Sequence, residues 1–212
     1  GNDFEAGNGR SVGGDYSSAE GRGRVGVALS DASTLALSGS YQDQNDLDYP
    51  GRLLHAEYFE TGMGQLTYTY AREQGLVRSV DARVGAQQTL HKMTNRTKPS
   101  YEKGMRIRVP TEVQNYNGRL AVDLVPASDW RLTLGADAVH TFRDATRFRS
   151  MKSMSMIHRE KAWPGATITQ EGVFAEVQHT LGEVTLTGAT RLDLAQADVK
   201  APSTAFLQTV PA

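Results

Sequence analysis

The stretch "WRLTLGADA", Trp130 to Ala138, alternates apolar and polar side chains over its whole length, with one glycine. Successive side chains of a β-strand point to opposite faces of a sheet, so strict alternation predicts a strand with one apolar and one polar face. The apolar set comprises Trp130, Leu132, Leu134, Ala136 and Ala138. The opposite face carries Arg131, Thr133 and Asp137, so it holds charge in the middle of the strand.

The same period of two recurs along the chain, and we find almost no helical period of 3.6 residues. Further clear examples are "TLALSGSY" (34–41), "GQLTYTYA" (64–71), "GRLAVDLV" (118–125) and "VTLTGATRLDL" (184–194). We predict eight strands, over residues 21–30, 34–45, 63–73, 76–92, 112–125, 130–144, 169–180 and 183–196. Several exceed the usual 5–6 residues of soluble strands, and about 10 residues are enough for a tilted strand to cross a membrane.

The predicted connections alternate in length. Tight hairpins join the first strand to the second, the third to the fourth, the fifth to the sixth and the seventh to the eighth. The links between these pairs are long, at residues 44–62, 93–111 and 146–169. An antiparallel transmembrane β-barrel has this rhythm, with short periplasmic turns and long extracellular loops.

Composition narrows the alternatives. The 212 residues are 39% hydrophobic, contain no cysteine and have a formal net charge of −1. Disulfides and thiolate metal sites are therefore excluded, and nothing indicates a nucleic-acid partner. No apolar run approaches the ~20 residues of a transmembrane helix. We find no nucleophile motif and no metalloprotease histidine pair, so we expect no enzymatic activity.

A soluble carbohydrate-binding sandwich would also alternate, and it remains an alternative. Two features favour a membrane barrel instead. The polar faces carry charge in mid-strand, at Asp81, Arg83, Arg119 and Asp123. Aromatic residues lie near strand ends, at Tyr41, Tyr68, Tyr70, Tyr116 and Trp130. Lipid outside, a polar lumen inside and aromatic girdles account for both features.

Methionine gathers in "SMKSMSMIH", Ser150 to His158, which falls in a predicted extracellular loop. Thioether sulfur suits Cu(I), and imidazole suits copper in either oxidation state. The candidate metal ligands in this loop are Met151, Met154, Met156 and His158. The alternative is plain packing, because methionine also fills irregular gaps between loops.

The order of the hairpins resembles the barrel of TonB-dependent outer-membrane receptors. The stretches that carry the resemblance are "GRVGVALSDASTLALSGSYQDQNDLDYPG" (23–51), "NYNGRLAVDLVPASDWRLTLGADAVHTFRDA" (115–145) and "EGVFAEVQHTLGEVTLTGATRLDLAQADV" (171–199). The resemblance implies a 22-stranded barrel in the bacterial cell outer membrane. Residues 1–212 would form a partial receptor barrel domain of about eight strands, without the plug domain and the C-terminal strands. It further implies contact with outer-membrane lipid and, through the plug, with the TonB–ExbB–ExbD energy-coupling complex.

Two stretches are similar to the copper receptors of this family, "DYPGR" (48–52) and "VDARVGAQQTLHKMTN" (80–95). The resemblance implies that His91 and Met93 are metal ligands. The expected function is uptake of a metal or metal complex, with copper as the transported ligand and no resident cofactor. A ferric-siderophore receptor is the alternative cargo class. A self-contained eight-stranded barrel with a structural or adhesive role also stays open.

Overall fold

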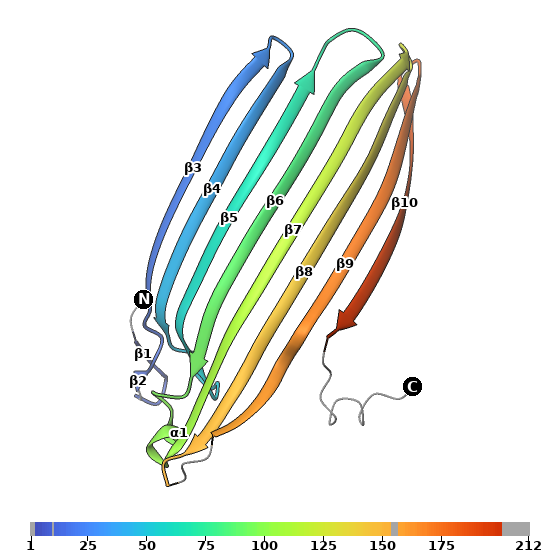
Figure 1. Ribbon diagram of the computed structural model, residues 1–212. Coiled ribbons are helices and arrows are strands. Elements are labelled where there is room, and N and C mark those ends of the chain that lie inside the picture. Colours follow the sequence, from blue (N-terminus) through green and yellow to red (C-terminus); the bar gives the residue numbers. More distant parts are fainter. Residues whose placement is uncertain (1–2, 10, 154–156, 201–212) are drawn as a thin grey trace.

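The structure is a computed structural model that describes residues 3–9, 11–153 and 157–200. Most of the described chain forms one antiparallel sheet of eight strands, in which each strand pairs with its neighbours in sequence (Figure 1). The strands are β3 (Ser17–Ser30), β4 (Ser33–Leu47), β5 (His55–Ala71), β6 (Val77–Thr94), β7 (Met105–Ala127), β8 (Trp130–Met151), β9 (Ile157–Leu181) and β10 (Val184–Val199). The predicted all-β antiparallel fold is confirmed.

Three small elements lie outside this sheet and were not expected. The strands β1 (Phe4–Glu5) and β2 (Ser11–Val12) pair with each other near the N-terminus. A four-residue helix, α1 (Pro99–Glu102), lies between β6 and β7. Among the residues that the structure describes, no helix combines the length and the hydropathy needed to cross a membrane.

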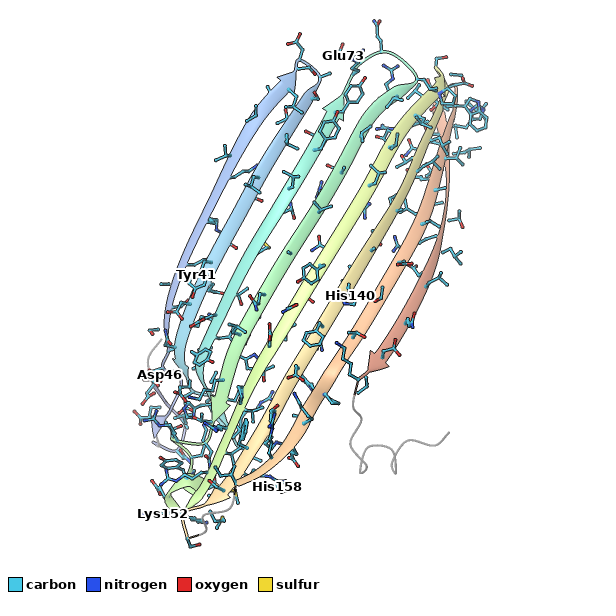
Figure 2. All side chains as sticks on the ribbon, viewed as in Figure 1. Tyr41, Asp46, Glu73, His140, Lys152 and His158 are labelled. Carbon is cyan, nitrogen blue, oxygen red and sulfur yellow. The ribbon has the colours of Figure 1, made fainter. Side chains whose placement is uncertain are left out.

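The strands extend further than the sequence pattern indicated, and the large extensions are all toward the same end of the sheet. Two connections at that end shrink to residues 48–54 and 95–104, where loops over 44–62 and 93–111 were expected. The third loop was expected over 146–169, but β8 continues to Met151 and β9 begins at Ile157. Beyond the apolar band the outward face carries charged residues such as Asp43, Glu60 and Arg108, so the alternation of an apolar outer face with a polar inner face ends although the hydrogen bonding continues. The alternation of short and longer connections remains. Figure 2 shows Glu73 in a turn at the short-turn end and Lys152 at the opposite end.

Strand register separates the residues into two faces, because directly paired residues point the same way. One row across the sheet pairs Val25, Leu37, Leu66, Val84, Gly118 and Ala138 in succession. We call this the apolar face, and it is uncovered: Val25 is 70% exposed and Leu194 is 66% exposed. The next row carries Arg83, Arg119 and Asp137 on the other side, which we call the polar face.

Aromatic residues border the apolar face at both ends. Tyr68, Tyr70 and Trp130 lie toward the short turns, whereas Tyr41, Tyr116 and Phe142 lie toward the other end. Beyond this second group, the same face turns acidic, with Asp43 paired to Glu60 on the neighbouring strand. An apolar band between aromatic rows is the pattern of a surface that meets lipid, with the polar face toward a lumen.

The sheet is not closed. Among the described residues β10 does not pair with β3, and each of these two strands keeps a free edge. A self-contained eight-stranded barrel requires that pairing, so the structure does not support this alternative. A sandwich requires a second large sheet packed on the first, and the described residues form none.

Candidate functional site

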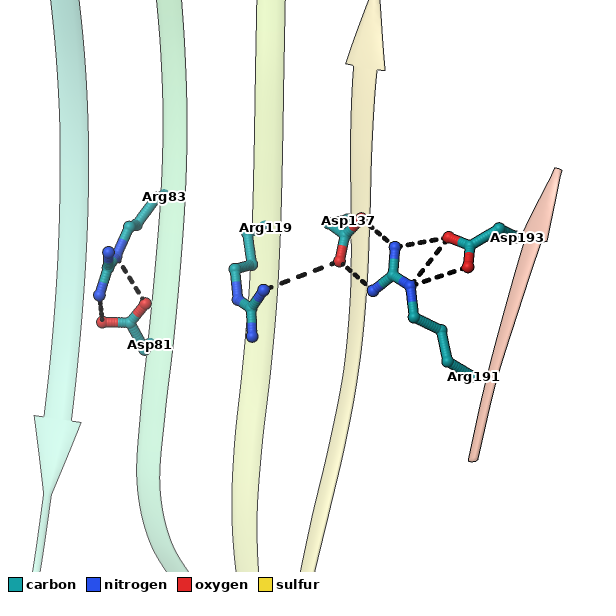
Figure 3. A network of polar contacts seen from close by, with 6 residues as sticks. All are labelled: Asp81, Arg83, Arg119, Asp137, Arg191 and Asp193. Carbon is teal, nitrogen blue, oxygen red and sulfur yellow. Dashed lines mark hydrogen bonds and ion pairs between the residues drawn. The ribbon is translucent and has the colours of Figure 1, made fainter. Parts of the chain in front are cut away.

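The polar face carries a network of paired charges near mid-strand (Figure 3). Arg191 on β10 donates two hydrogen bonds of 2.8 Å to the carboxylate of Asp137 on β8. The same arginine donates from Nε to Asp193 at 2.8 Å, and Arg119 on β7 lies 3.8 Å from Asp137. Each charged side chain in this network is paired with one of opposite sign, so the region does not offer an unpaired carboxylate to a cation.

Glycine makes this network geometrically possible. Strand β9 runs between β8 and β10, and Gly172 occupies the position that separates Asp137 from Asp193. A Cβ atom at Gly172 would overlap Nη2 of Arg191. The arginine therefore crosses β9 only because that strand has no side chain at this point.

His91 and Met93 lie two residues apart near the end of β6, on the polar face and beyond the apolar band. The His91 imidazole stacks on Phe59 of β5, with ring centroids 5.0 Å apart and planes 9° apart. Its Nδ1 atom is buried and has no hydrogen-bond partner among the described residues. Burial lowers the pKa of His91, so the ring is neutral at pH 7 and keeps a lone pair. A neutral imidazole beside a thioether matches the donors that copper accepts.

The second predicted group lies elsewhere. Met151 ends β8 and pairs with Met105 of β7, and both are about two-fifths exposed, at 40% and 39%. His158 lies on β9, where its Nε2 atom is 3.7 Å from Glu160. Met151 and His158 thus belong to strand ends, whereas the sequence placed them in a loop. Met154 and Met156 fall outside the described residues.

The structure does not bring the two groups into one centre. His91 is in register with Ala145 of β8 through Thr111, whereas His158 pairs with Arg149, four positions further along β8. Four residues and three strand spacings separate the two histidines by roughly 20 Å. In the described part of the chain, no three His, Asp or Glu side chains gather as a metal site. Metal binding by either group stays a prediction.

A buried histidine that the sequence did not single out holds the adjoining loops together. His55, only 4% exposed, lies 3.2 Å through Nε2 from Thr94 Oγ1 and 3.1 Å through Nδ1 from Thr97 Oγ1. Beside it, Lys98 Nζ donates to Asp48 Oδ1 at 2.5 Å. These contacts join the segment after β4 to the segment after Met93. The sequence gives no signal for them because all these residues fall in the predicted connections 44–62 and 93–111, where no period of two marks them.

We expect the contacts of His55 with Thr94 and Thr97 to weaken in acid. Burial is the main cause that lowers the pKa of His55; Lys98 acts the same way, while Asp48, Asp46 and Glu57 oppose it. The contacts of neutral His55 therefore contribute their full stability above the ordinary histidine pKa of about 6.5. Their contribution to stability falls as the pH drops below that value. Hydrogen exchange of residues 94–98, corrected for intrinsic rates, should quicken between pH 7.5 and pH 5. In His55→Gln this extra acid response should vanish; an equal response in that variant would contradict the assignment.

The fold defines a class of protein: an antiparallel sheet with an apolar outer face, a charged inner face and alternating turn lengths is part of an outer-membrane type of β-barrel. Among solved structures, the copper transporter OprC has this fold, with a TM-score of 0.80 and 22% sequence identity. The match covers 94% of this chain and 32% of the transporter, so the chain spans about a third of that structure. No family model and no curated protein matches the sequence.

Proposed function

We propose that this chain is part of the barrel of a TonB-dependent outer-membrane receptor that takes up a metal or a metal complex, and that the cargo is copper. The fold likeness to a structure named as a copper transporter supports the transport class. The observation that carries the choice of copper is the buried, unpartnered Nδ1 of His91 with Met93 on the same face.

The proposed path begins at the rim and continues along the polar face. Met151 and His158 offer donors where solute arrives, and His91 with Met93 offers a second set nearer the membrane. Met154 and Met156, outside the described residues, remain candidate ligands from the sequence. Thioether and imidazole hold copper without carboxylate charge. Deeper in, Asp137 is already neutralised by Arg119 and Arg191, so no free carboxylate of that network retains a cation.

The remaining elements of the proposal follow from the same class. The apolar face contacts lipid of the bacterial outer membrane, and energy comes from the TonB–ExbB–ExbD complex through a plug domain. The protein acts as a receptor and transporter rather than as an enzyme. A ferric siderophore is the second cargo class, because an arginine and an aromatic ring, Arg143 on Trp163, lie on the polar face toward the same end of the sheet.

Copper uptake by cells that carry the protein in their outer membrane tests the proposal. We expect the double variant His91→Ala and Met93→Ala to need a copper concentration at least about tenfold higher for half-maximal uptake, since two of its ligands are lost. The readout is accumulation of radioactive copper at graded concentrations.

The matched control is the double variant Met63→Ala and His140→Ala, which removes the same two residue types from β5 and β8. Met63 is on the polar face, and His140, labelled in Figure 2, is on the apolar face. His140 Nδ1 lies 2.8 Å from Thr169 Oγ1. This control should take up copper normally. Unchanged copper uptake in the His91 and Met93 variant, together with reduced uptake of a ferric siderophore, would replace copper by the second cargo class.

A further inference from the structure

A groove of about 400 Å³ lies on the apolar-face side of the sheet, beyond the aromatic and acidic rows. Four cationic side chains and one carboxylate line it: Lys92, Arg96, Arg106, Arg108 and Glu57. The excess of three positive charges is local, because the whole chain has a formal net charge of −1. Register places it on the outward side, since Arg108 is an even-numbered residue of β7 like Leu120 of the apolar band.

Aromatic rings, rather than carboxylates, hold two arginines that line this groove and a third, Arg159, that lies against a ring of its lining. The guanidinium carbon of Arg108 lies 4.5 Å from the Phe148 ring centre, and that of Arg159 lies 5.8 Å from the same ring. Arg106 lies 3.5 Å over Tyr101. We call these three residues the arginine patch. Within the described chain none of them is within 4.0 Å of a carboxylate, whereas Lys92 is paired with Glu57 at 2.9 Å.

This arrangement leaves the guanidinium donors available. A ring face attracts the plane of the guanidinium and orients it, but it does not use the five N–H donors that lie in that plane. Arg191 on the polar face is different, because its N–H groups already donate to Asp137 and Asp193. Oriented guanidinium groups with free edges match phosphate oxygens, which accept two parallel hydrogen bonds from one arginine.

Height above the lipid limits which phosphates can reach the patch. Phe148 lies six positions beyond Phe142 on β8, which is roughly 20 Å along the strand and about 15 Å in height at the usual tilt. Headgroups of phospholipids add only about 5–8 Å to each side of the hydrocarbon. A phosphate at the patch must therefore be carried outward by a longer headgroup.

We propose that the arginine patch binds phosphate groups on the saccharide headgroup of a glycolipid in the outer leaflet. The patch points away from the lumen, so this contact is separate from the proposed cargo path and independent of which metal is carried. It fastens the part of the sheet that stands above the membrane to the surrounding lipid surface.

The test uses the protein purified in nonionic detergent from outer membranes. The probes are bacterial lipopolysaccharide, the same lipopolysaccharide after chemical removal of its phosphates, phosphatidylglycerol and inorganic phosphate. We expect the triple variant Arg106→Gln, Arg108→Gln and Arg159→Gln to bind lipopolysaccharide about tenfold more weakly or worse. The charge-matched control is Arg24→Gln, Arg72→Gln and Arg78→Gln, which removes three arginines away from the groove and should bind normally.

The binding of lipopolysaccharide by the patch variant and by the control variant separates the proposal from its alternatives. Weak binding by the patch variant alone, and weak binding of dephosphorylated lipopolysaccharide to the natural protein, support the proposal. Equal loss in the control variant would reduce the effect to total charge and overturn it. Equally tight binding of phosphatidylglycerol or of inorganic phosphate would overturn the assignment to a saccharide headgroup. Heat-modifiable gel mobility verifies that both variants are folded. The triple variant Arg106→Lys, Arg108→Lys and Arg159→Lys keeps the charge but cannot donate two parallel hydrogen bonds from one side chain, so it should bind at an intermediate level.

Discussion

Leu120→Arg is expected to destabilise the membrane-inserted protein by about 2–4 kcal/mol, the usual penalty for a cation at the lipid-facing midplane of a barrel. Leu120 is 46% exposed on the apolar face of β7. Its directly paired neighbours are Ala82 and Ala136, which offer no polar partner. Folding into lipid vesicles, titrated with urea and read by heat-modifiable gel mobility, measures the difference.

The adjacent residue supplies the control. Ala121→Arg introduces the same side chain one position later, on the polar face, where the paired residue is Asp81. We expect this variant to fold with nearly natural stability, because the new arginine reaches water and a carboxylate. If both variants fold equally well, the apolar face does not meet lipid.

Gly135→Ala is expected to cost about 1–3 kcal/mol or more through overpacking. A Cβ atom at Gly135 would overlap the Phe174 ring and lie 2.8 Å from the carbonyl oxygen of Leu120. The ring could swing aside, but it would then leave the position where Arg119 lies 4.8 Å from its centre. The backbone carbonyl cannot move without disturbing the pairing of β7 with β8.

Gly118→Ala is the matched comparison, on β7 and on the opposite face. The nearest atoms to a Cβ there are 3.9 Å and 4.0 Å away, so the added methyl group has room. We expect little change or a small gain in stability, since glycine weakens a strand interior. Urea unfolding followed by tryptophan fluorescence compares the two variants. Equal midpoints would show that Phe174 and the carbonyl of Leu120 do not crowd Gly135.

The number, order and facing of the eight strands were predictable because lipid on one side and water on the other impose a period of two. Strand β8 shows where this reasoning ends. The alternation supports residues 130–144, yet β8 continues to Met151. Past Phe142 neither face meets lipid, so hydrophobicity no longer marks which residues are paired.

The candidate site was predictable in part for a related reason. Residues two apart on a strand share a face, so the common orientation of His91 and Met93 follows from their spacing. The separation of His158 from them depends on strand register, which alternation alone does not specify. The burial of His55 depends on how two connections pack, and no local pattern encodes that contact.

The sequential order of the strands has a consequence for how the sheet is built. Every strand of the eight-stranded sheet pairs only with the strands before and after it in the chain. No strand pairs with a segment that is distant in the sequence. Each pairing therefore closes a loop of only one short turn or one connection of modest length. The sheet can therefore gain strands one hairpin at a time, in the order of the sequence, while the rest of the chain is still unfolded.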